Sequence, residues 1–405
     1  MANVSSSNGL EKRPKLRFPG FDEPWKETTL SALFSKSTQK NADGHITNVI
    51  CNSAKLGLIP QREYFDKDIA NSDNTSGYYI IRQNDFVYNP RKSSDAPYGP
   101  ISSYKYAEDG IVSPLYLCFH AKDKINPLYY EWYFRSSAWH RYIYMSGDSG
   151  ARHDRVSIKD DTFFAMPINL PSEQEQSKIA SFLQSLDDRI AAQEKLVASL
   201  KKYKRGVMRA IFRDKSFVFS KATVWKSIRL GDECVFFSGG TPKSTDSSYY
   251  GGSIPFIRSG EIHGEKTELF LTEAGLQNSS AKMVSKGDLL IALYGATSGE
   301  VDISKIDGAI NQAILCIRPY DMSKQYLRYL LEDSKDDIIN TYLQGGQGNL
   351  SAEIIKNLRV DMPDSTAQSS VVEFLSMIER RIEMSIAECE QIQAMKRSLI
   401  QQLFI

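Results

Sequence analysis

The sequence lacks most of the features by which enzymes, metal proteins and membrane proteins are recognised. Its 405 residues include five cysteines and five histidines, with no CxxC pair and no spacing typical of zinc ligands. No apolar run approaches the roughly 18 residues of a membrane-spanning helix. It contains neither a Gly-x-x-x-x-Gly-Lys-Ser/Thr loop for ATP nor a His-Glu-x-x-His metal helix. These absences argue against an ATP-driven motor, a metalloenzyme and an integral membrane protein.

A large excess of positive charge is also missing. The 50 basic and 49 acidic side chains give a net charge of +1, so any surface that binds nucleic acid must be local. Cys118 and Cys316 fall in strand-like runs and Cys389 on an apolar helix face, which predicts buried free thiols in a reducing cytosol. The polar start, Met1 to Lys15, has no apolar core of a signal peptide, and we expect a cytoplasmic protein.

The chain contains two related halves, because short motifs recur in the same order about 200 residues apart. A period this long is outside the 20–50 residues of a solenoid repeat and indicates two homologous domains. The matched pairs are Trp25-Lys26 with Trp225-Lys226, Asp85-Phe86-Val87 with Asp288-Leu289-Leu290, Gly110-Ile111-Val112 with Gly308-Ala309-Ile310, Leu117-Cys118 with Leu315-Cys316, and Pro171 with Pro363.

Each half ends in a run whose apolar residues are spaced by four and three in alternation. The first series is Ile179, Leu183, Leu186, Ile190, Gln193, Val197, Leu200, Lys204, Val207 and Ile211. The second is Val371, Leu375, Ile378, Ile382, Ser385, Cys389, Ile392, Lys396, Leu399 and Leu403. A seven-residue period held for this long predicts a coiled-coil seam. Ordinary amphipathic helices packed on their own domains are the alternative.

Polar breaks occur at matching places in the two series, Gln193 with Ser385 and Lys204 with Lys396. Before the helices, Ser172 and Asp364 are N-cap candidates that follow Pro171 and Pro363. Between the helices, short apolar runs bounded by Gly, Asp and Pro predict strands at 78–81, 86–88, 289–293 and 313–317. Helical stretches are expected near 129–144 and 324–342. Each half is therefore predicted to be a mixed α and β domain followed by a long helix.

An ordered set of motifs runs from about residue 14 to the end of the sequence. The motifs are Pro14-Lys15-Leu16-Arg17-Phe18-Pro19-Gly20-Phe21 with Trp25, Leu170-Pro171 to Glu175-Gln176 with Ile179, Gly239-Gly240-Thr241-Pro242, Tyr249 to Ile257, Gly287-Asp288-Leu289-Leu290, Tyr294-Gly295-Ala296-Thr297 and Asn311-Gln312. In this order, the set resembles the specificity subunits of type I restriction-modification systems. The second copy keeps Gln368 but has Ala367 where the first has Glu175.

The resemblance implies an α+β fold of two homologous mixed α/β target recognition domains. They would be joined by two long antiparallel coiled-coil helices with pseudo-two-fold symmetry. The expected segments are a flexible tail (1–15), target recognition domain 1 (16–167), spacer helix 1 (168–212), target recognition domain 2 (213–361) and spacer helix 2 (362–405). It also implies as partners double-stranded DNA, two methyltransferase subunits and restriction/translocase subunits. S-adenosylmethionine, ATP and Mg would be used by those partners, with no cofactor in this chain.

Three small, polar loops of the second domain are candidates for DNA contact, because hydroxyls, amides and glycine N–H groups suit phosphates and base edges. Plain turn chemistry is the alternative. The candidate residues of this domain are Gly239, Gly240, Thr241, Lys243, Arg258, Ser259, Tyr294, Thr297, Asn311, Gln347 and Asn349.

The first domain departs from that pattern, since it lacks Gly-Gly-Thr-Pro and has Ser113-Pro114 in place of Asn311-Gln312. Its arginines and lysines are suited to phosphates or guanines, although a solvated basic loop is the alternative. Unlike loops predict that the two domains recognise unlike sequences. The candidate residues are Asn52, Lys55, Asn89, Arg91, Lys92, Tyr98, Arg152 and Arg155.

Four arginines at matching positions of the two long helices lie off the apolar seam. A residue kept in both copies but outside the seam suggests contact with a partner subunit, and helix solubility is the alternative. They are Arg189 with Arg381 and Arg205 with Arg397. A run of seven cations between Lys201 and Lys215 fits the negative end of a helix dipole, a DNA backbone or a methyltransferase contact.

The sequence therefore predicts a non-catalytic DNA specificity subunit that reads an asymmetric bipartite target. It would direct adenine methylation and cleavage by its partners. Asn89-Pro90-Arg91 lacks the second proline and the aromatic residue of the amino-methyltransferase box. A coiled-coil interaction scaffold without DNA binding is the alternative from another class, and an enzyme with an unrecognised site is a third.

Overall fold

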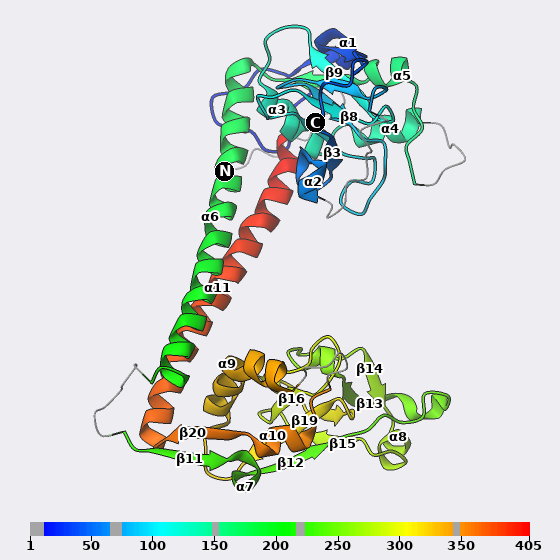
Figure 1. Ribbon diagram of the computed structural model, residues 1–405. Coiled ribbons are helices and arrows are strands. Elements are labelled where there is room, and N and C mark those ends of the chain that lie inside the picture. Colours follow the sequence, from blue (N-terminus) through cyan, green and yellow to red (C-terminus); the bar gives the residue numbers. More distant parts are fainter. Residues whose placement is uncertain (1–11, 65–74, 148–153, 216–222, 343–348) are drawn as a thin grey trace. The chain divides into compact units, whose positions relative to one another are not determined.

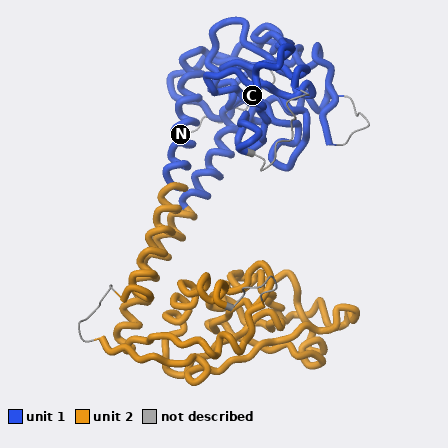
Figure 2. Tube along the Cα trace, viewed as in Figure 1, with its two compact units in different colours: residues 1–193, 388–405 blue, residues 194–387 orange. Residues whose placement is uncertain are grey.

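A computed structural model describes residues 12–64, 75–147, 154–215, 223–342 and 349–405. The chain divides into two compact units, one of residues 1–193 with 388–405 and one of residues 194–387 (Figure 2). The two units share the order of their main sheet strands and each contains part of both long helices, but they differ in the short helices between the strands (Figure 1). Within the described residues, no helix is long and apolar enough to cross a membrane.

Unit 1 is built on a four-stranded sheet with the order β2-β9-β6-β7. Three two-stranded pairs accompany it: β1-β10, β3-β4 and β5-β8. The strands are β1 (Lys26–Thr29), β2 (Phe34–Ser37), β3 (Ile50–Ser53), β4 (Gly57–Pro60), β5 (Tyr79–Ile81), β6 (Phe86–Tyr88), β7 (Ile101–Ser103), β8 (Gly110–Val112), β9 (Leu117–Ala121) and β10 (Pro167–Leu170). The helices are α1 (Leu30–Leu33), α2 (Gln61–Tyr64), α3 (Pro127–Arg135), α4 (His140–Ser146) and α5 (Asp160–Phe164), followed by α6 (Glu173–Phe212).

Unit 2 repeats this plan. Its sheet has the order β12-β19-β16-β17, and β11-β20 and a second sheet, β14-β13-β18-β15, accompany it. The strands are β11 (Trp225–Arg229), β12 (Cys234–Ser238), β13 (Tyr250–Ile257), β14 (Leu269–Leu271), β15 (Lys282–Val284), β16 (Leu289–Ala292), β17 (Val301–Ile303), β18 (Gly308–Ile310), β19 (Ile314–Pro319) and β20 (Arg359–Pro363). The helices are α7 (Leu230–Glu233), η2 (Ser247–Tyr249), η3 (Ser259–Glu261), α8 (Glu273–Gln277), α9 (Lys324–Tyr342), α10 (Ala352–Asn357) and α11 (Ser365–Leu403).

The predicted long helices are confirmed as α6, of 40 residues, and α11, of 39. Ser172 Oγ accepts the N–H of Glu175 at 3.3 Å, and Asp364 Oδ1 accepts the N–H of Ala367 at 3.0 Å, so both predicted caps are present. Every predicted seam position is buried or half-buried. The seam is therefore the packed face of each helix, as the heptad spacing predicted.

Within each unit the two helix segments run antiparallel. In unit 1, Asp187 contacts Lys396 and Arg189 contacts Glu388, so an advance along α6 corresponds to a retreat along α11. In unit 2, Lys204 contacts Glu379. The packed seam residues belong to the domain cores: Ile179, Leu183, Ile400 and Leu403 in unit 1, and Val207, Ile211, Val371 and Leu375 in unit 2.

The two lysines that interrupt the seam form equivalent contacts. The Lys204 ammonium donates to Glu379 and Glu332, both at 2.7 Å, and lies 5.3 Å from the Tyr329 ring centroid. Lys396 donates to Asp187 and lies 4.6 Å from the Trp132 ring centroid. We call this arrangement of lysine, carboxylate and aromatic ring the helix clasp. In each unit it joins α6, α11 and one helix of the domain, α9 or α3.

The core of unit 1 is rich in aromatic residues. Phe34, Phe86 and Phe119 of the sheet pack edge-on or stacked against one another, with ring centroids 5.3–5.7 Å apart. Trp132 and Tyr133 of α3 complete this core, which buries each of these rings almost fully. The predicted burial of the thiols is confirmed for Cys118, Cys316 and Cys389. Cys234 is also buried, while Cys51 is half-buried.

Candidate nucleic-acid interface

Three loops of unit 1 meet at the edge of the sheet where β6 ends and β7 begins. The β6–β7 loop begins with Asn89-Pro90-Arg91, and the segment at 154–156 pairs with it. Arg91 and Arg155 form an antiparallel bridge, and the flanking N–H groups of Lys92 and Val156 donate to the carbonyls of Asp154 and Pro90, both at 2.9 Å. The β3–β4 turn is the third loop. Candidate DNA-contact residues from three separate parts of the sequence are thus brought together.

These loops surround a cleft of about 730 Å³. Six of the eight candidates of the first domain line it: Asn52, Lys55, Asn89, Arg91, Lys92 and Arg155. Tyr98 lies in the same loop but is half-buried, and its ring packs 4.8 Å from that of His140. Arg152 lies outside the described residues.

Two of the six lining residues hold the cleft together. Asn52 is 5% exposed; its Nδ2 donates to the carbonyls of Val87 (2.8 Å) and Pro100 (3.2 Å), and its Oδ1 accepts from Ser102 Oγ at 2.8 Å. Asn89 Nδ2 donates to the Asn52 carbonyl at 3.3 Å, and its Oδ1 accepts the Arg91 N–H at 3.1 Å. Because these amides are already bonded within the protein, they position the loops.

The cations of the cleft have few partners. Lys55 lies 3.7 Å from Asp95, and both side chains are more than half exposed. Arg91 and Lys92 are exposed, and among the described residues neither side chain has a hydrogen bond or ion pair. The cleft therefore has a positive surface that is available to an anionic or acceptor-rich ligand.

The equivalent edge of unit 2 brings together Gly239-Gly240-Thr241 and Asn311-Gln312. Thr241 Oγ1 donates to Gln312 Oε1 at 2.7 Å. A Cβ on Gly239 would lie 1.8 Å from the Ile310 carbonyl oxygen, and one on Gly240 would lie 1.9 Å from Ser280 Oγ. Glycine is required because the loop packs directly on neighbouring atoms. The Gly239 N–H donates to the Asn311 carbonyl at 3.3 Å, so it is not exposed for phosphate as the sequence suggested.

The β16–β17 loop, with Tyr294 and Thr297, begins at the same edge of unit 2. Leu350 donates its N–H to the Leu293 carbonyl at 2.8 Å, as Val156 does to Pro90 in unit 1. This contact brings the exposed Asn349 beside the loop. Gln347 lies outside the described residues.

Arg258 is held within unit 2 by two carboxylates. Its guanidinium contacts Glu261 at 3.1 Å and Glu268 at 2.5 Å, and these hydrogen bonds raise its pKa. Ser259 follows it at the start of η3, and Lys243 is exposed in the Gly-Gly-Thr-Pro loop. An arginine with both acceptors inside its own domain is less suited to reading a base than one without them.

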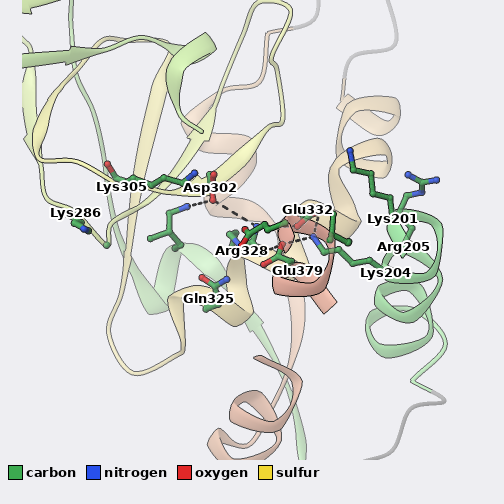
Figure 3. A pocket seen from close by; sticks show the side chains of 15 residues that line it. Lys201, Lys204, Arg205, Lys286, Asp302, Lys305, Gln325, Arg328, Glu332 and Glu379 are labelled. Carbon is green, nitrogen blue, oxygen red and sulfur yellow. Dashed lines mark hydrogen bonds and ion pairs between the residues drawn. The ribbon is translucent and has the colours of Figure 1, made fainter. Parts of the chain in front are cut away.

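The four helix arginines are exposed. Arg189 forms an ion pair with Glu388 at 2.9 Å, whereas no such pair occurs for Arg205, Arg381 or Arg397 among the described residues. Arg205 lines a second cleft of about 670 Å³ in unit 2, shown in Figure 3. The other exposed cations of this cleft are Lys201, Lys286 and Lys305. Lys201 belongs to the run of cations noted in the sequence, whereas Lys286 and Lys305 were not predicted as site residues.

The floor of this second cleft is a network of charged side chains (Figure 3). Arg328 contacts Glu379 at 2.6 Å and Asp302 at 3.9 Å, and Glu379 also accepts from Lys204. Burial raises the pKa of Glu379, but the hydrogen bonds and the charge of Arg328, with Lys204 and Tyr329, outweigh burial and lower it. The floor carboxylates are thus paired with cations of the same network, while the exposed cations at the rim have no ion pair among the described residues and are available to a partner.

Comparison with known proteins places this architecture in a family. The family model described as "Type I restriction modification DNA specificity domain" matches residues 27–202 and again 223–394. A putative type I restriction enzyme MjaX specificity subunit of Methanocaldococcus jannaschii is 24% identical over 297 residues, which span 69% of this chain and 67% of that protein. The MjaVIII specificity subunit of the same organism is 26% identical over 260 residues, or 59% of this chain and 61% of that protein.

Solved structures share the fold. A chain from a study of assembly and conformational transition of the type I R-M system superposes with a TM-score of 0.63 at 17% identity, covering 94% of this chain and 97% of that one. The type I restriction-modification S subunit from M. genitalium gives a TM-score of 0.54 at 16% identity, covering 97% and 99%. With two matches that together cover most of its length, the chain belongs to the type I restriction modification DNA specificity domain family and carries two copies of that domain.

Proposed function

We propose that this chain is the DNA specificity subunit of a type I restriction-modification complex and reads an asymmetric, bipartite target. The observation that carries the proposal is the duplicated sheet edge. Both units end the same strands at the same place and present equivalent loops there, but the loops differ in chemistry. Equivalent placement suits one DNA-reading role in both domains, and different side chains suit two different half-sites.

As a specificity subunit, the chain is the non-catalytic component of the complex. Its partners are double-stranded DNA, two methyltransferase subunits and restriction/translocase subunits, with S-adenosylmethionine, ATP and Mg used by those partners. Adenine methylation requires the base to leave the stack, which is the task of the partner's active site. The exposed Arg205 at the rim of the second cleft supports a partner-binding role for the helix arginines.

Methylome sequencing tests the proposal. A host that expresses this chain with its methyltransferase and restriction subunits is expected to acquire one methylated motif made of two unlike half-sites with an unspecified gap. A continuous or palindromic motif would contradict the bipartite reading. A complex that assembles but shifts no DNA in a gel would instead support an interaction scaffold.

A further inference from the structure

Arg91 and Arg155 lie directly opposite each other in the lining of the unit 1 cleft. Residues opposed across an antiparallel bridge point their side chains to the same side, with Cβ atoms about 5 Å apart. Both line the cleft. Arg155 is half-buried, and its Nε is buried with no hydrogen-bond partner in the described part of the chain.

Such a pair is unfavourable in the free protein. Like charges directly opposite one another are destabilising, and a buried N–H without an acceptor carries a desolvation cost. Of the described residues that line the cleft, Asp95 is the one carboxylate, and it lies 3.7 Å from Lys55. The described residues that line the cleft supply no acceptor for the buried Nε of Arg155, and a ligand bound in the cleft could supply one.

We infer that Arg91 and Arg155 read guanine bases in the half-site bound by the first domain, an inference that rests on the proposed function. Guanine presents O6 and N7 in the major groove, and the planar guanidinium fork matches these two acceptors. The backbones of Arg91 and Arg155 are fixed by the two flanking 2.9 Å hydrogen bonds, which suits base reading. The exposed Lys55 and Lys92 at the rim suit phosphate contacts.

The second domain has no equivalent pair in the part that the structure describes. Its candidate arginine, Arg258, is bonded to Glu261 and Glu268, and its edge presents the hydroxyl of Thr297 and the amides of Gln312 and Asn349. We therefore place the guanine contacts in one half-site only.

The test uses the full chain co-produced with its methyltransferase subunits, and duplexes that carry the motif found by methylome sequencing. Arg91→Gln and Arg155→Gln are each expected to weaken binding to the target about tenfold. Each substitution should weaken binding much less on a duplex in which the G·C pair that the arginine contacts has already been replaced. Placing 7-deazaguanine at that pair removes N7. This base should weaken DNA binding by the original protein by a similar factor. It should add little to the loss of binding already caused by substituting the arginine that contacts that pair.

Two controls separate base reading from phosphate binding and from misfolding. Arg91→Lys keeps the charge but loses the planar fork. It should therefore bind all duplexes more tightly than Arg91→Gln does, without regaining the original protein's preference for guanine. Lys92→Gln, in the same loop, should weaken all sequences alike. Because neutralising one of two opposed cations removes repulsion, Arg91→Gln should not lower the melting temperature.

Three results would overturn the inference. The first is a motif in which neither half-site contains a G·C pair whose recognition depends on these arginines. The second is an equal loss on every duplex with a salt slope reduced by about one for each arginine, which marks phosphate contacts. The third is no DNA binding by the intact complex, which would also refute the proposed function, whereas the first two would leave it standing.

Discussion

The lysines of the helix clasp are the two charged residues of a mostly apolar seam, which Gln193 and Ser385 also interrupt. A lysine is 9% exposed at position 204, where burial without partners would be costly. Glu379, Glu332 and the Tyr329 ring supply the partners, and Asp187 and the Trp132 ring do so for Lys396. The clasp thus fixes which domain surface each helix segment packs against, a specificity that apolar residues alone would not provide.

Lys204→Ala is expected to lower the free energy of unfolding by about 2 kcal/mol, because hydrogen bonds to charged groups contribute roughly this amount. Arg328 still neutralises Glu379 in the variant, which limits the loss. Urea unfolding measures the change. The exposed neighbour Lys202 is the matched control, and Lys202→Ala should change stability by less than about 0.5 kcal/mol. Equal effects of the two substitutions would show that the clasp contributes nothing.

Individual roles at the candidate interface followed from the sequence only in part. Spacing and residue type identified Asn52, Arg91 and Arg155 as members of polar loops, and the structure brings them to one cleft. Their division of labour depends on distant partners. Asn52 is saturated by carbonyls 35 and 48 residues away, and Arg258 is held by Glu268 across a turn. No local pattern reveals such contacts, since the same residue types occur in exposed turns.

At the scale of elements, the duplication extends to the turn that precedes β6 and β16. Asn84 and Gly287 both have a positive φ, of 71° and 91°. The next residue, Asp85 or Asp288, accepts the backbone N–H of Arg82 or Ser285 at 2.8 and 2.9 Å. The surroundings of the two carboxylates differ, since Arg318 and Lys324 bond Asp288 while His120 occupies the place of Arg318 in the first half.

The pKa of Asp288 should make the second domain sensitive to acid. Burial raises this pKa, but hydrogen bonds from Arg318, the Ser285 N–H and Lys324 outweigh burial and lower it from 3.8 to about 2. A lowered folded-state pKa stabilises the protein above the unfolded pKa, and the contribution is lost as pH falls from about 4 towards 2. Asp288→Asn should therefore cost about 2 kcal/mol at pH 7 and much less near pH 2, as measured by urea unfolding across pH.

Asp85→Asn is the matched control. Burial raises the pKa of Asp85, so ionisation of this carboxyl is less favourable in the folded protein than in the unfolded chain. An asparagine keeps an acceptor for the Arg82 N–H and removes the buried charge, so no comparable loss is expected. A loss of equal size from both substitutions would mean that the turn hydrogen bond, rather than the ion pairs, is responsible.

Elements with a strong local signal were predicted well, and their pairing was not. The seven-residue period and the caps located α6 and α11, and apolar runs located β6, β16 and β19. The order of the sheets depends on contacts such as β2 with β9, about 80 residues apart, which a period of two or of 3.6 does not encode. The convergence of loops on one sheet edge therefore emerged only with the fold.

For the whole molecule, the helices should set the gap between the half-sites. Inserting one heptad into both α6 and α11, beside Gln193 and Ser385, keeps the seam in register and adds about 10 Å of helix. The unspecified gap should lengthen by about three base pairs while both half-sites stay the same. Methylome sequencing measures the motif. Changed half-site bases with an unchanged gap would contradict a spacer role.

The duplication also predicts that one copy of this chain binds two methyltransferase subunits. The two units repeat the same sheet and the same helix clasp, so a surface present on both is presented twice, as in an isologous dimer. Arg205 and its counterpart Arg397 are exposed, off the seam, and without an ion pair among the described residues. Helix solubility would also explain exposed arginines, and the experiment below separates it from partner binding.

Native mass spectrometry of the co-expressed complex should give a species with two methyltransferase subunits to one copy of this chain. Arg205→Glu should leave mainly a one-to-one species, whereas Lys202→Glu should not change the ratio. A stable one-to-one complex that methylates both strands, with no two-to-one species at any concentration, would refute the prediction.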